Sequence, residues 1–272
     1  MNYINSALNF TGSKYKILDQ ILPELDFTKK YFVDLFAGSG VVGFNVVDKY
    51  DKILTNDIIK DLIGIHKELI NNPLEFIEKV KSLVVSKEDQ SGFNKLRENY
   101  NNNNSAEGLY ALLLCSTNNM LRYSLSFRYN QTFGKRTYNS STEKKLNEFI
   151  KHITPYKNKI LFSSKHFAEI KILKPSMIYI DPPYSNSTAG YNNYWKKDDD
   201  NKLYKYCKEL DKNNNSFMLS GIIGEHKDGK RWKLIDDLIA DGYKYKILDF
   251  DYEGVARKKK SKNSQEIIIY NY

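Results

Sequence analysis

The stretch Phe32-Val33-Asp34-Leu35-Phe36-Ala37-Gly38-Ser39-Gly40 runs from an apolar segment into a glycine-rich turn. Tyr31–Phe36 predicts a buried strand, and Val41–Tyr50, after the turn, predicts a helix. Lys52–Thr55 predicts a second strand, which ends at Asn56-Asp57. A strand, a turn, a helix and a second strand in this order predict a parallel sheet with right-handed crossovers.

Helical and strand patterns extend from this unit in both directions. A helix is expected at Tyr15–Leu25, before the first strand. Further helices are expected at Asp61–Ile70, Leu74–Leu83, Phe93–Asn99 and Gly108–Thr117. Further strands are expected at Ile160–Phe162, Met177–Ile180, Phe217–Ser220, Tyr245–Phe250 and Glu266–Tyr270. Asn101–Asn104 and Asn213–Asn215 predict loops, because asparagine competes with regular backbone hydrogen bonding. The sequence therefore predicts an α/β sheet domain of residues 1–60 and 151–272, interrupted by a mostly helical insertion of residues 61–150.

Composition and charge exclude several classes of protein. The 272 residues suit one large domain or one domain with an insertion, and no apolar run is long enough to span a bilayer. Met1–Lys16 lacks the apolar core of a signal peptide, so a cytoplasmic protein without membrane association is expected. Cys115 and Cys207 are far apart, and the histidines show no metal-ligand spacing, so no metal site is expected. The net charge of +9 favours a polyanionic partner.

The glycine turn and the acid after the second strand together suggest a nucleoside cofactor. Glycine lacks a Cβ atom, so the backbone can turn sharply and approach a ligand closely. Asp57 follows Gly40 by 17 residues, an offset at which a carboxylate can accept hydrogen bonds from ribose hydroxyls. The alternative is a plain tight turn followed by a solvated acid. A diphosphate cofactor is disfavoured, because only two glycines of the dinucleotide pattern are present, and one acid does not choose between adenosine-containing cofactors.

The apolar strand Met177–Ile180 runs directly into Asp181-Pro182-Pro183-Tyr184. The paired prolines stiffen the turn, and Asp181 is placed at the carboxyl end of a buried strand, where open α/β sheets bind ligands. The Asp181 carboxylate and the Pro182 carbonyl can each accept one N–H of an exocyclic aromatic amine. These hydrogen bonds strengthen as the nitrogen becomes tetrahedral and positive, so they accelerate its attack on a methyl group. Tyr184 offers a flat face on which an unstacked base can stack.

In these motifs, and in their order along nearly the whole chain, the sequence resembles the Dam-like class of adenine-specific DNA methyltransferases. Asn9–Lys14 looks like the family's N-terminal motif, whose lysine contacts the methionine carboxylate of the cofactor. Asp34–Gly40 is similar to the methionine-binding turn, although Leu35 replaces the usual proline. Asp57 matches the ribose-binding acid. The resemblance implies a Rossmann-like methyltransferase sheet with helices on both faces and S-adenosyl-L-methionine as cofactor.

The resemblance also implies roles for individual residues. The catalytic residues are Asp181, Pro182, Pro183 and Tyr184. The cofactor-binding residues are Phe10, Lys14, Asp34, Phe36, Ala37, Gly38, Gly40, Asp57, His166, Phe167 and Asp181. His166 occupies a position where family members often carry an acid, and Gly221 stands where asparagine is common.

The insertion resembles the family's target-recognition region. Asn119–Tyr123 and Tyr129–Arg136 look like a shortened form of its DNA-facing hairpin, with Thr132 where proline is usual. The implied DNA-binding residues are Arg122, Tyr123, Arg128, Asn130, Lys135 and Arg136. Basic and aromatic residues interleaved in this way suit contacts to phosphates and bases. A solvated amphipathic loop is the alternative. The basic loop Arg257–Lys262 and the aromatic Trp195 are further candidates for DNA and base contacts, with solvation and packing as their alternatives.

The sequence therefore predicts a site-specific DNA adenine methyltransferase that acts on a flipped adenine in double-stranded DNA. Restriction-modification, with a cognate endonuclease acting independently, and phage self-protection both fit this activity. Methylation of RNA or of a protein amide is an alternative, which the Asp181–Tyr184 motif and the basic insertion disfavour. A nucleic-acid-binding protein with an inactive cofactor fold is another alternative, which the intact motif disfavours.

Overall fold

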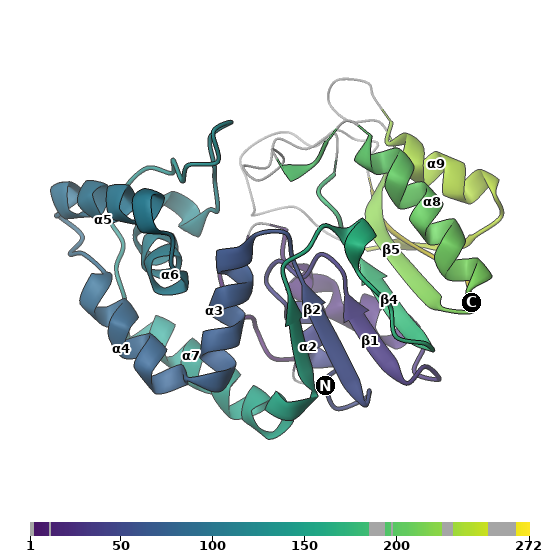
Figure 1. The fold of residues 1–272 in the computed structure, drawn as a ribbon, viewed down its shortest axis with the longest axis horizontal. Coiled ribbons are helices and arrows are strands. Elements are labelled where there is room, and N and C mark those ends of the chain that lie inside the picture. Colours follow the sequence, from purple (N-terminus) through teal and green to yellow (C-terminus); the bar gives the residue numbers. More distant parts are fainter. Residues whose placement is uncertain (1–2, 11, 185–193, 197, 225–230, 250–264) are drawn as a thin grey trace.

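The computed structural model describes residues 3–10, 12–184, 194–196, 198–224, 231–249 and 265–272. The basic loop Arg257–Lys262, His226 and the predicted strand end at Phe250 lie outside the described residues. Figure 1 shows a central sheet with α8 and α9 on one side and α2 and α3 on the other, and with α4 to α7 set beside it.

One seven-stranded sheet, in the order β3-β2-β1-β4-β5-β7-β6, forms the centre of the described structure. The strands are β1 (Tyr31–Asp34), β2 (Lys52–Asn56), β3 (Ile160–Ser163), β4 (Ser176–Ile180), β5 (Ser216–Ile223), β6 (Lys244–Leu248) and β7 (Gln265–Tyr270). The first five strands pair in parallel, and β7 is antiparallel to both of its neighbours. The α/β class and the Rossmann-like sheet predicted from the sequence are confirmed.

The strand order reverses between β1 and β4, which pair with Asp34 opposite Tyr179. At such a switch point the connections leave the sheet on opposite sides, and a crevice opens at the carboxyl ends of the strands. Asp34, Asn56 and Ile180 are the last residues of β1, β2 and β4. The glycine turn, Asp57 and Asp181 therefore meet at one edge of the sheet.

Alternating side chains of the strands supply two hydrophobic cores. On β4, Met177 and Tyr179 pack with the N-terminal segment and the helices of the insertion. Ile178 and Ile180 pack on the opposite face with α8 (Asp199–Lys212) and α9 (Lys233–Ala240). The core of the helical insertion is therefore continuous with one face of the sheet.

The helical segment between β2 and β3 is organised around a central buried helix. Its helices are α3 (Lys60–Asn71), α4 (Pro73–Leu83), α5 (Gln90–Asn103), α6 (Ala106–Cys115) and α7 (Ser140–Ile153). Every residue of α6 from Gly108 onward is buried, and α3, α4 and α5 pack against it. Side-chain oxygens of Asp89, Ser105 and Asn139 accept backbone N–H bonds at the starts of α5, α6 and α7.

Two predicted helices are shorter than expected. Tyr15–Leu25 forms three short pieces, η1 (Lys14–Ile17), α1 (Leu18–Ile21) and η2 (Leu22–Glu24), and Pro23 lies in the last of them. The predicted Val41–Tyr50 helix is only α2 (Val41–Asn45). The Asn45 side chain bonds to the backbone of Ile4, which fastens the end of α2 to the N-terminal segment.

The prediction for one asparagine run is wrong. Asn101–Asn103 belongs to α5, where packing of Phe93, Leu96 and Tyr100 outweighs the low helix propensity of asparagine. Asn213 and Asn214 do lie in a turn after α8, and Asn214 has a φ of 59°.

His66 joins the insertion to the glycine turn. It lies on α3 with no exposed surface, and its Nε2 is 2.8 Å from the carbonyl oxygen of Gly38. Its ring meets Phe44 of α2 at 5.2 Å between centroids, nearly edge to face. Burial lowers the pKa of His66 to about 4, so the imidazole is neutral in the folded protein near neutral pH.

We expect His66 to weaken the fold in mild acid. The unfolded chain takes up a proton near the ordinary histidine pKa of about 6.5, while folded His66 stays neutral down to about pH 4. The contribution of His66 to the free energy of unfolding is therefore fully present above pH 6.5. It falls by about 1.4 kcal/mol per pH unit as the pH decreases toward 4. Urea unfolding of the wild type and of His66→Gln at about pH 7, 6 and 5 measures this effect. We expect the stability difference to move in favour of the variant by about 2 kcal/mol between pH 7 and 5.

The comparison with the variant is needed because Asp34 acts in the opposite direction. Burial raises the pKa of Asp34 to about 7, so its contribution falls as the pH rises from about 4 to 7. Both proteins carry Asp34, so the difference between them isolates His66. A constant difference across the pH range would contradict the prediction.

Candidate active site

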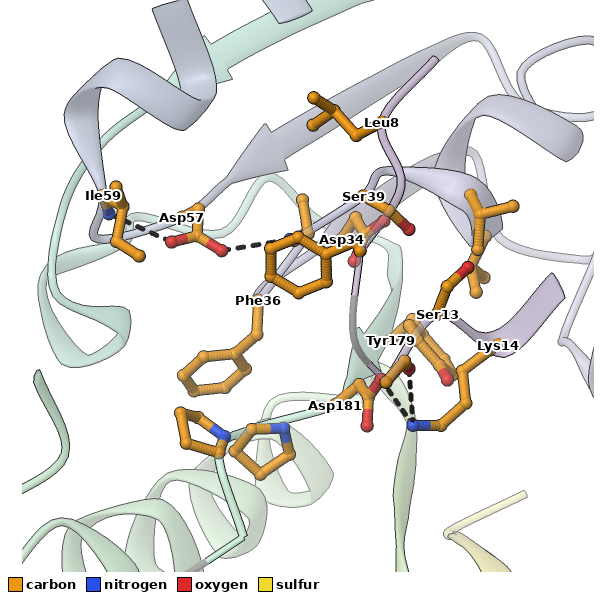
Figure 2. Close-up of a pocket in the computed structure, with 18 of the residues that line it drawn as sticks. Leu8, Ser13, Lys14, Asp34, Phe36, Ser39, Asp57, Ile59, Tyr179 and Asp181 are labelled. Carbon is orange, nitrogen blue, oxygen red and sulfur yellow. Dashed lines mark hydrogen bonds and ion pairs between the residues drawn. The ribbon is translucent and has the colours of Figure 1, made fainter. Parts of the chain in front are cut away.

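A cavity of about 930 Å³ opens at the carboxyl ends of β1, β2 and β4. Its volume is at the upper end of the range for small-molecule sites. Figure 2 shows Lys14, Asp34, Phe36, Asp57 and Asp181 around it. Among the predicted site residues, its wall includes Phe10, Lys14, Asp34, Phe36, Ala37, Gly38, Asp57, Arg136, His166, Phe167, Asp181, Pro182, Pro183 and Tyr184. Residues that are far apart in the sequence are thus brought together in one place.

The glycine turn between β1 and α2 requires glycine at two positions. Gly38 and Gly40 have φ values of 49° and 70°, in the left-handed region. A Cβ atom on Gly40 would lie 2.2 Å from the ring of Phe44, and one on Gly38 would lie 3.0 Å from the ring of Phe10. Gly38 lines the cavity, whereas Gly40 is not among the wall residues and is instead the N-cap residue that precedes α2.

Asp57 holds the turn from the second strand. One carboxylate oxygen accepts the Gly38 N–H at 3.0 Å, and the other accepts the Ile59 N–H at 3.0 Å, as Figure 2 shows. A carboxylate has about four lone-pair sites, so two backbone bonds leave capacity for ligand hydroxyls. Burial raises the pKa of Asp57, and the two backbone N–H groups lower it. The net effect is a pKa above the ordinary value.

Asp34, the last residue of β1, is buried and lines the cavity. Its carboxylate accepts the Gly43 N–H at 3.2 Å, so it fastens the start of α2. Burial, together with the nearby Asp181 and Asp57, raises its pKa to about 7. Asp34 therefore both stabilises the start of α2 and lines the cavity.

Asp181, at the end of β4, is paired with Lys14. The Lys14 Nζ lies 2.9 Å from one carboxylate oxygen, and the Tyr184 hydroxyl donates to the other at 3.1 Å. Lys14 also donates to the Tyr184 hydroxyl at 3.0 Å and to the Gly12 carbonyl at 3.4 Å. Burial lowers the pKa of Lys14, but Asp181 and Glu266 raise it more, so the lysine remains charged. The sequence predicted Lys14, Asp181 and Tyr184 for the site but did not predict their pairing.

Aromatic rings form the side of the cavity next to the glycine turn. The ring centroids of Phe36 and Phe167 are 5.5 Å apart, and Trp195 stacks on Phe167 at 5.7 Å. The Trp195 Nε1 donates to Asp200 at 3.0 Å, which fixes the orientation of the indole. Flat apolar faces of this kind suit a nucleobase.

His166 stands where family members often carry an acid, and it contacts its neighbours in the aromatic side of the cavity. Its ring lies over Phe167 at 4.4 Å, and its Nδ1 accepts the Ala168 N–H at 3.4 Å. Its Nε2 lies 3.6 Å from the buried carboxylate of Asp199 on α8. His166 thereby orients the aromatic side of the cavity.

The predicted DNA-binding residues lie in two different environments. Arg122, Arg128, Lys135 and Arg136 are exposed, and the Arg136 Nη1 donates to the Asn119 Oδ1 at 2.7 Å at the cavity wall. Tyr123 is buried, and its hydroxyl lies 3.0 Å from that of Tyr100. The structure thus places Tyr123 inside the insertion.

Residues 123–129 form a hairpin-like turn that α5 supports. Tyr123 and Tyr129 make an antiparallel bridge. The Asn101 side chain accepts the Tyr129 N–H at 2.7 Å and donates to the Tyr129 carbonyl at 3.0 Å. Asn101 therefore binds the hairpin backbone as a neighbouring strand would. No pattern in the sequence indicates this role, because an asparagine run resembles a loop.

Asn130 lies next to this contact. Its N–H donates to the Arg122 carbonyl at 3.1 Å, and its side-chain oxygen is buried without a hydrogen-bond partner within the described ranges.

Two kinds of feature are absent from the described residues. No helix in that part of the chain is long and apolar enough to cross a membrane. No group of three or more His, Cys, Asp or Glu side chains there is arranged to hold a metal ion.

The sheet, the glycine turn with Asp57, and the Asp181–Tyr184 motif around one cavity are the arrangement of a Rossmann-like methyltransferase fold. The family model of the D12 class N6 adenine-specific DNA methyltransferases matches residues 10–253. The chain belongs to this family.

Two proteins with similar sequences are named as a modification methylase and a type II methyltransferase. The modification methylase StsI of Streptococcus sanguinis is 30% identical over 285 residues, which cover 99% of this chain and 43% of that protein. The type II methyltransferase M.FokI of Planomicrobium okeanokoites is 30% identical over 288 residues, which cover all of this chain and 43% of that protein. The chain thus spans less than half the length of these relatives. A solved structure of a putative methylase from Haemophilus influenzae matches with 11% identity and a TM-score of 0.29, covering 95% of this chain and 87% of that one.

Proposed function

We propose that the chain is a DNA adenine methyltransferase that transfers a methyl group to the N(6) amine of a flipped adenine. The observation that carries the proposal is the position of Asp181 and Pro182, which line the same cavity as Asp57 and the glycine turn. Two groups that can accept hydrogen bonds from an amine thus line the same cavity as a turn suited to a nucleoside, so both can serve one reaction. The family match and the similarity to modification methylases support this activity.

The residues of the cavity fit S-adenosyl-L-methionine, which supplies an activated methyl group on its sulfonium when bound. Asp57 has lone pairs left for the ribose hydroxyls, and the turn at Gly38 lets a ligand approach the backbone. Phe36 and Phe167 offer apolar faces to the adenine. Lys14 is the predicted partner of the methionine carboxylate. Its three protons already face Asp181, Tyr184 and Gly12. To bind the carboxylate, Lys14 would give up the longest of these hydrogen bonds, the one to Gly12.

Asp181 and Pro182 would orient the target amine. A carboxylate only accepts hydrogen bonds, and that of Asp181 is held in place by the Lys14 Nζ at 2.9 Å. The Asp181 carboxylate would accept one N–H of the amine, and the Pro182 carbonyl the other. Both bonds would strengthen as the nitrogen becomes positive, which favours the transition state over the ground state. The proton is then lost to solvent, so no separate strong base is needed.

We propose that residues 61–150 recognise the DNA and that residues 1–60 and 151–272 carry the catalysis. Arg122 precedes the hairpin-like turn and Arg128 lies within it, and both are exposed, while Arg136 lies at the cavity wall. Arginines in these places suit contacts to phosphates near a base that enters the cavity. The similarity to modification methylases supports a role in restriction-modification, with an endonuclease acting independently on the same sequence.

Methyl transfer from labelled cofactor to unmethylated duplex DNA, RNA and protein, assayed in parallel, tests the proposal. We expect label in duplex DNA only, on the N(6) of adenine. Label in RNA or protein alone would overturn the assignment of the substrate. Cofactor and DNA binding without any transfer would favour a nucleic-acid-binding protein with an inactive cofactor fold.

We expect Arg136→Ala to weaken DNA binding about tenfold and to make it less dependent on salt. The arginine is exposed at the cavity wall, so its loss removes a phosphate contact and the counterion release that accompanies it. DNA affinity measured over a series of salt concentrations checks this. Lys144→Ala is the control, because Lys144 is exposed on α7 and is absent from the cavity wall. An unchanged salt slope for Arg136→Ala would remove it from the phosphate contacts.

A further inference from the structure

The peptide groups of Gly38 are held from two sides. Its N–H donates to the Asp57 carboxylate at 3.0 Å, and its carbonyl oxygen lies 2.8 Å from the His66 Nε2. Asp57 follows β2, and His66 lies on α3, so two elements outside the turn fix one residue within it. Glycine at a φ of 49° is free to rotate unless such contacts hold it.

The single bond to Gly38 fixes the tautomer of His66. A carbonyl oxygen only accepts hydrogen bonds, so the Nε2 of the neutral imidazole must carry the proton. Nδ1 is then an acceptor, and it is buried without a hydrogen-bond partner among the residues described. The ring is fully buried against Phe44.

An unsatisfied buried acceptor destabilises the fold, and an apolar ring would fill the same space without that cost. The compensating interaction is the bond to the turn. The imidazole donates a hydrogen bond to the Gly38 carbonyl, which a phenylalanine at this position could not do.

We infer that His66 is a positioning residue that fixes the Gly38 peptide in the orientation needed to receive the nucleoside cofactor. It acts from the first helix of the insertion, so the recognition segment helps to shape the cofactor site. This inference rests on the proposed function, because it assumes that the turn binds S-adenosyl-L-methionine. His66 does not touch the reacting atoms.

The test compares His66→Phe, which keeps the packing but removes the donor, with His66→Gln, whose amide can donate from nearly the same place. Calorimetry measures the dissociation constants of S-adenosyl-L-methionine and S-adenosyl-L-homocysteine. We expect His66→Phe to weaken both by about tenfold, the size expected for loss of one buried hydrogen bond, and His66→Gln to restore affinity to within about threefold of wild type. Equal affinities for wild type and His66→Phe would overturn the inference, as would equal losses in both variants.

His152 offers a matched control. It lies on α7, and its Nε2 is 3.0 Å from the Phe44 carbonyl, outside the glycine turn. His152→Phe removes the same kind of bond, so we expect unchanged cofactor affinity. An equal loss in His152→Phe would show a general effect of weakened packing and would overturn the specific role.

The tautomer of the wild-type histidine gives a readout that does not depend on any variant folding. Nitrogen-15 spectra of histidine-labelled protein should show His66 with its proton on Nε2 at neutral pH. A proton on Nδ1 would overturn the inference. If the wild type itself binds no cofactor, the proposed function fails; if it binds and His66→Phe binds equally well, only this inference fails.

Discussion

Asp181→Asn is expected to lower the rate of methyl transfer by about 10³-fold while cofactor affinity stays within about threefold of wild type. The carboxylate is the charged acceptor of the pair that would hold the target amine, and its effect grows as positive charge develops on the nitrogen. Asparagine keeps an oxygen of similar shape but removes the negative charge. The loss should therefore fall on the chemical step, measured in a single turnover with labelled cofactor and duplex DNA.

Asparagine is a better substitution than alanine because Lys14 is buried beside Asp181. The Lys14 side chain is only 8% exposed, and Asp181 is its ion-pair partner at 2.9 Å. Alanine would leave that charge with fewer partners, which typically costs about 3–5 kcal/mol of stability for a buried pair. The amide oxygen of asparagine can still accept a Lys14 proton, so the variant is expected to fold.

Calorimetry with S-adenosyl-L-homocysteine checks that the site remains intact. Asp51→Asn, at an exposed ion pair with Lys30, is the control for an asparagine substitution and should keep full activity. Loss of cofactor binding together with activity would mean that Asp181 holds the cofactor rather than the amine. Retention of full activity would contradict the role given to the carboxylate.

The sequence was informative where chemistry is encoded by adjacent residues. The strand that ends in Asp181-Pro182-Pro183-Tyr184 and the strand that ends in the glycine turn were both predicted, and they pair directly in the sheet. Their shared edge follows from the rule that parallel strands present their carboxyl ends together. The main elements of the cavity could therefore be predicted without any knowledge of side-chain positions.

Contacts between distant residues were not predictable in the same way. Lys14 and Asp181 are 167 positions apart in the chain, and only the folded sheet brings them to 2.9 Å. His66 carries no spacing signal, since one histidine on an apolar helix face resembles a packing residue. The asparagine pattern predicts a loop at Asn101, whereas its role depends on a hairpin residue 28 positions further along.

Three helices were missed although their patterns were present. Leu203, Cys207 and Leu210 on α8 and Leu234, Ile235 and Leu238 on α9 recur at helical spacing and are buried. On α7, Asn139 bonds to the Thr142 N–H at 3.0 Å and precedes the buried Leu146 and Phe149. Helix caps and short apolar periods within polar sequence were the signals that would have found them.

Gly134→Ala is expected to weaken DNA binding by at least about tenfold and to leave cofactor affinity unchanged. The Gly134 N–H donates to the Cys115 carbonyl at 2.8 Å, where the chain returns from the hairpin to the end of α6. A Cβ atom at this position would lie 2.4 Å from the carbonyl carbon and oxygen of Ser116. These are main-chain atoms at the end of a buried helix, so the segment around Gly134 must move, and Arg136 would move with it. Overpacking of this kind typically costs about 1–3 kcal/mol, and here the displacement falls on the proposed DNA contacts.

Gly242→Ala separates this local collision from the general cost of replacing a glycine. Gly242 has a φ of 87°, but a Cβ there would meet nothing within 4 Å, and it lies in the turn after α9. Its replacement should reduce stability through backbone strain while DNA affinity stays at the wild-type level. Fluorescence anisotropy with labelled duplex DNA, and calorimetry with S-adenosyl-L-homocysteine, measure the two affinities for each variant. Gly134→Ala with wild-type DNA affinity would show that the segment from Tyr129 to Arg136 does not bind the DNA. An equal loss of cofactor affinity would show instead that the helical segment and the sheet respond to the collision as one unit, as the continuous core between them allows.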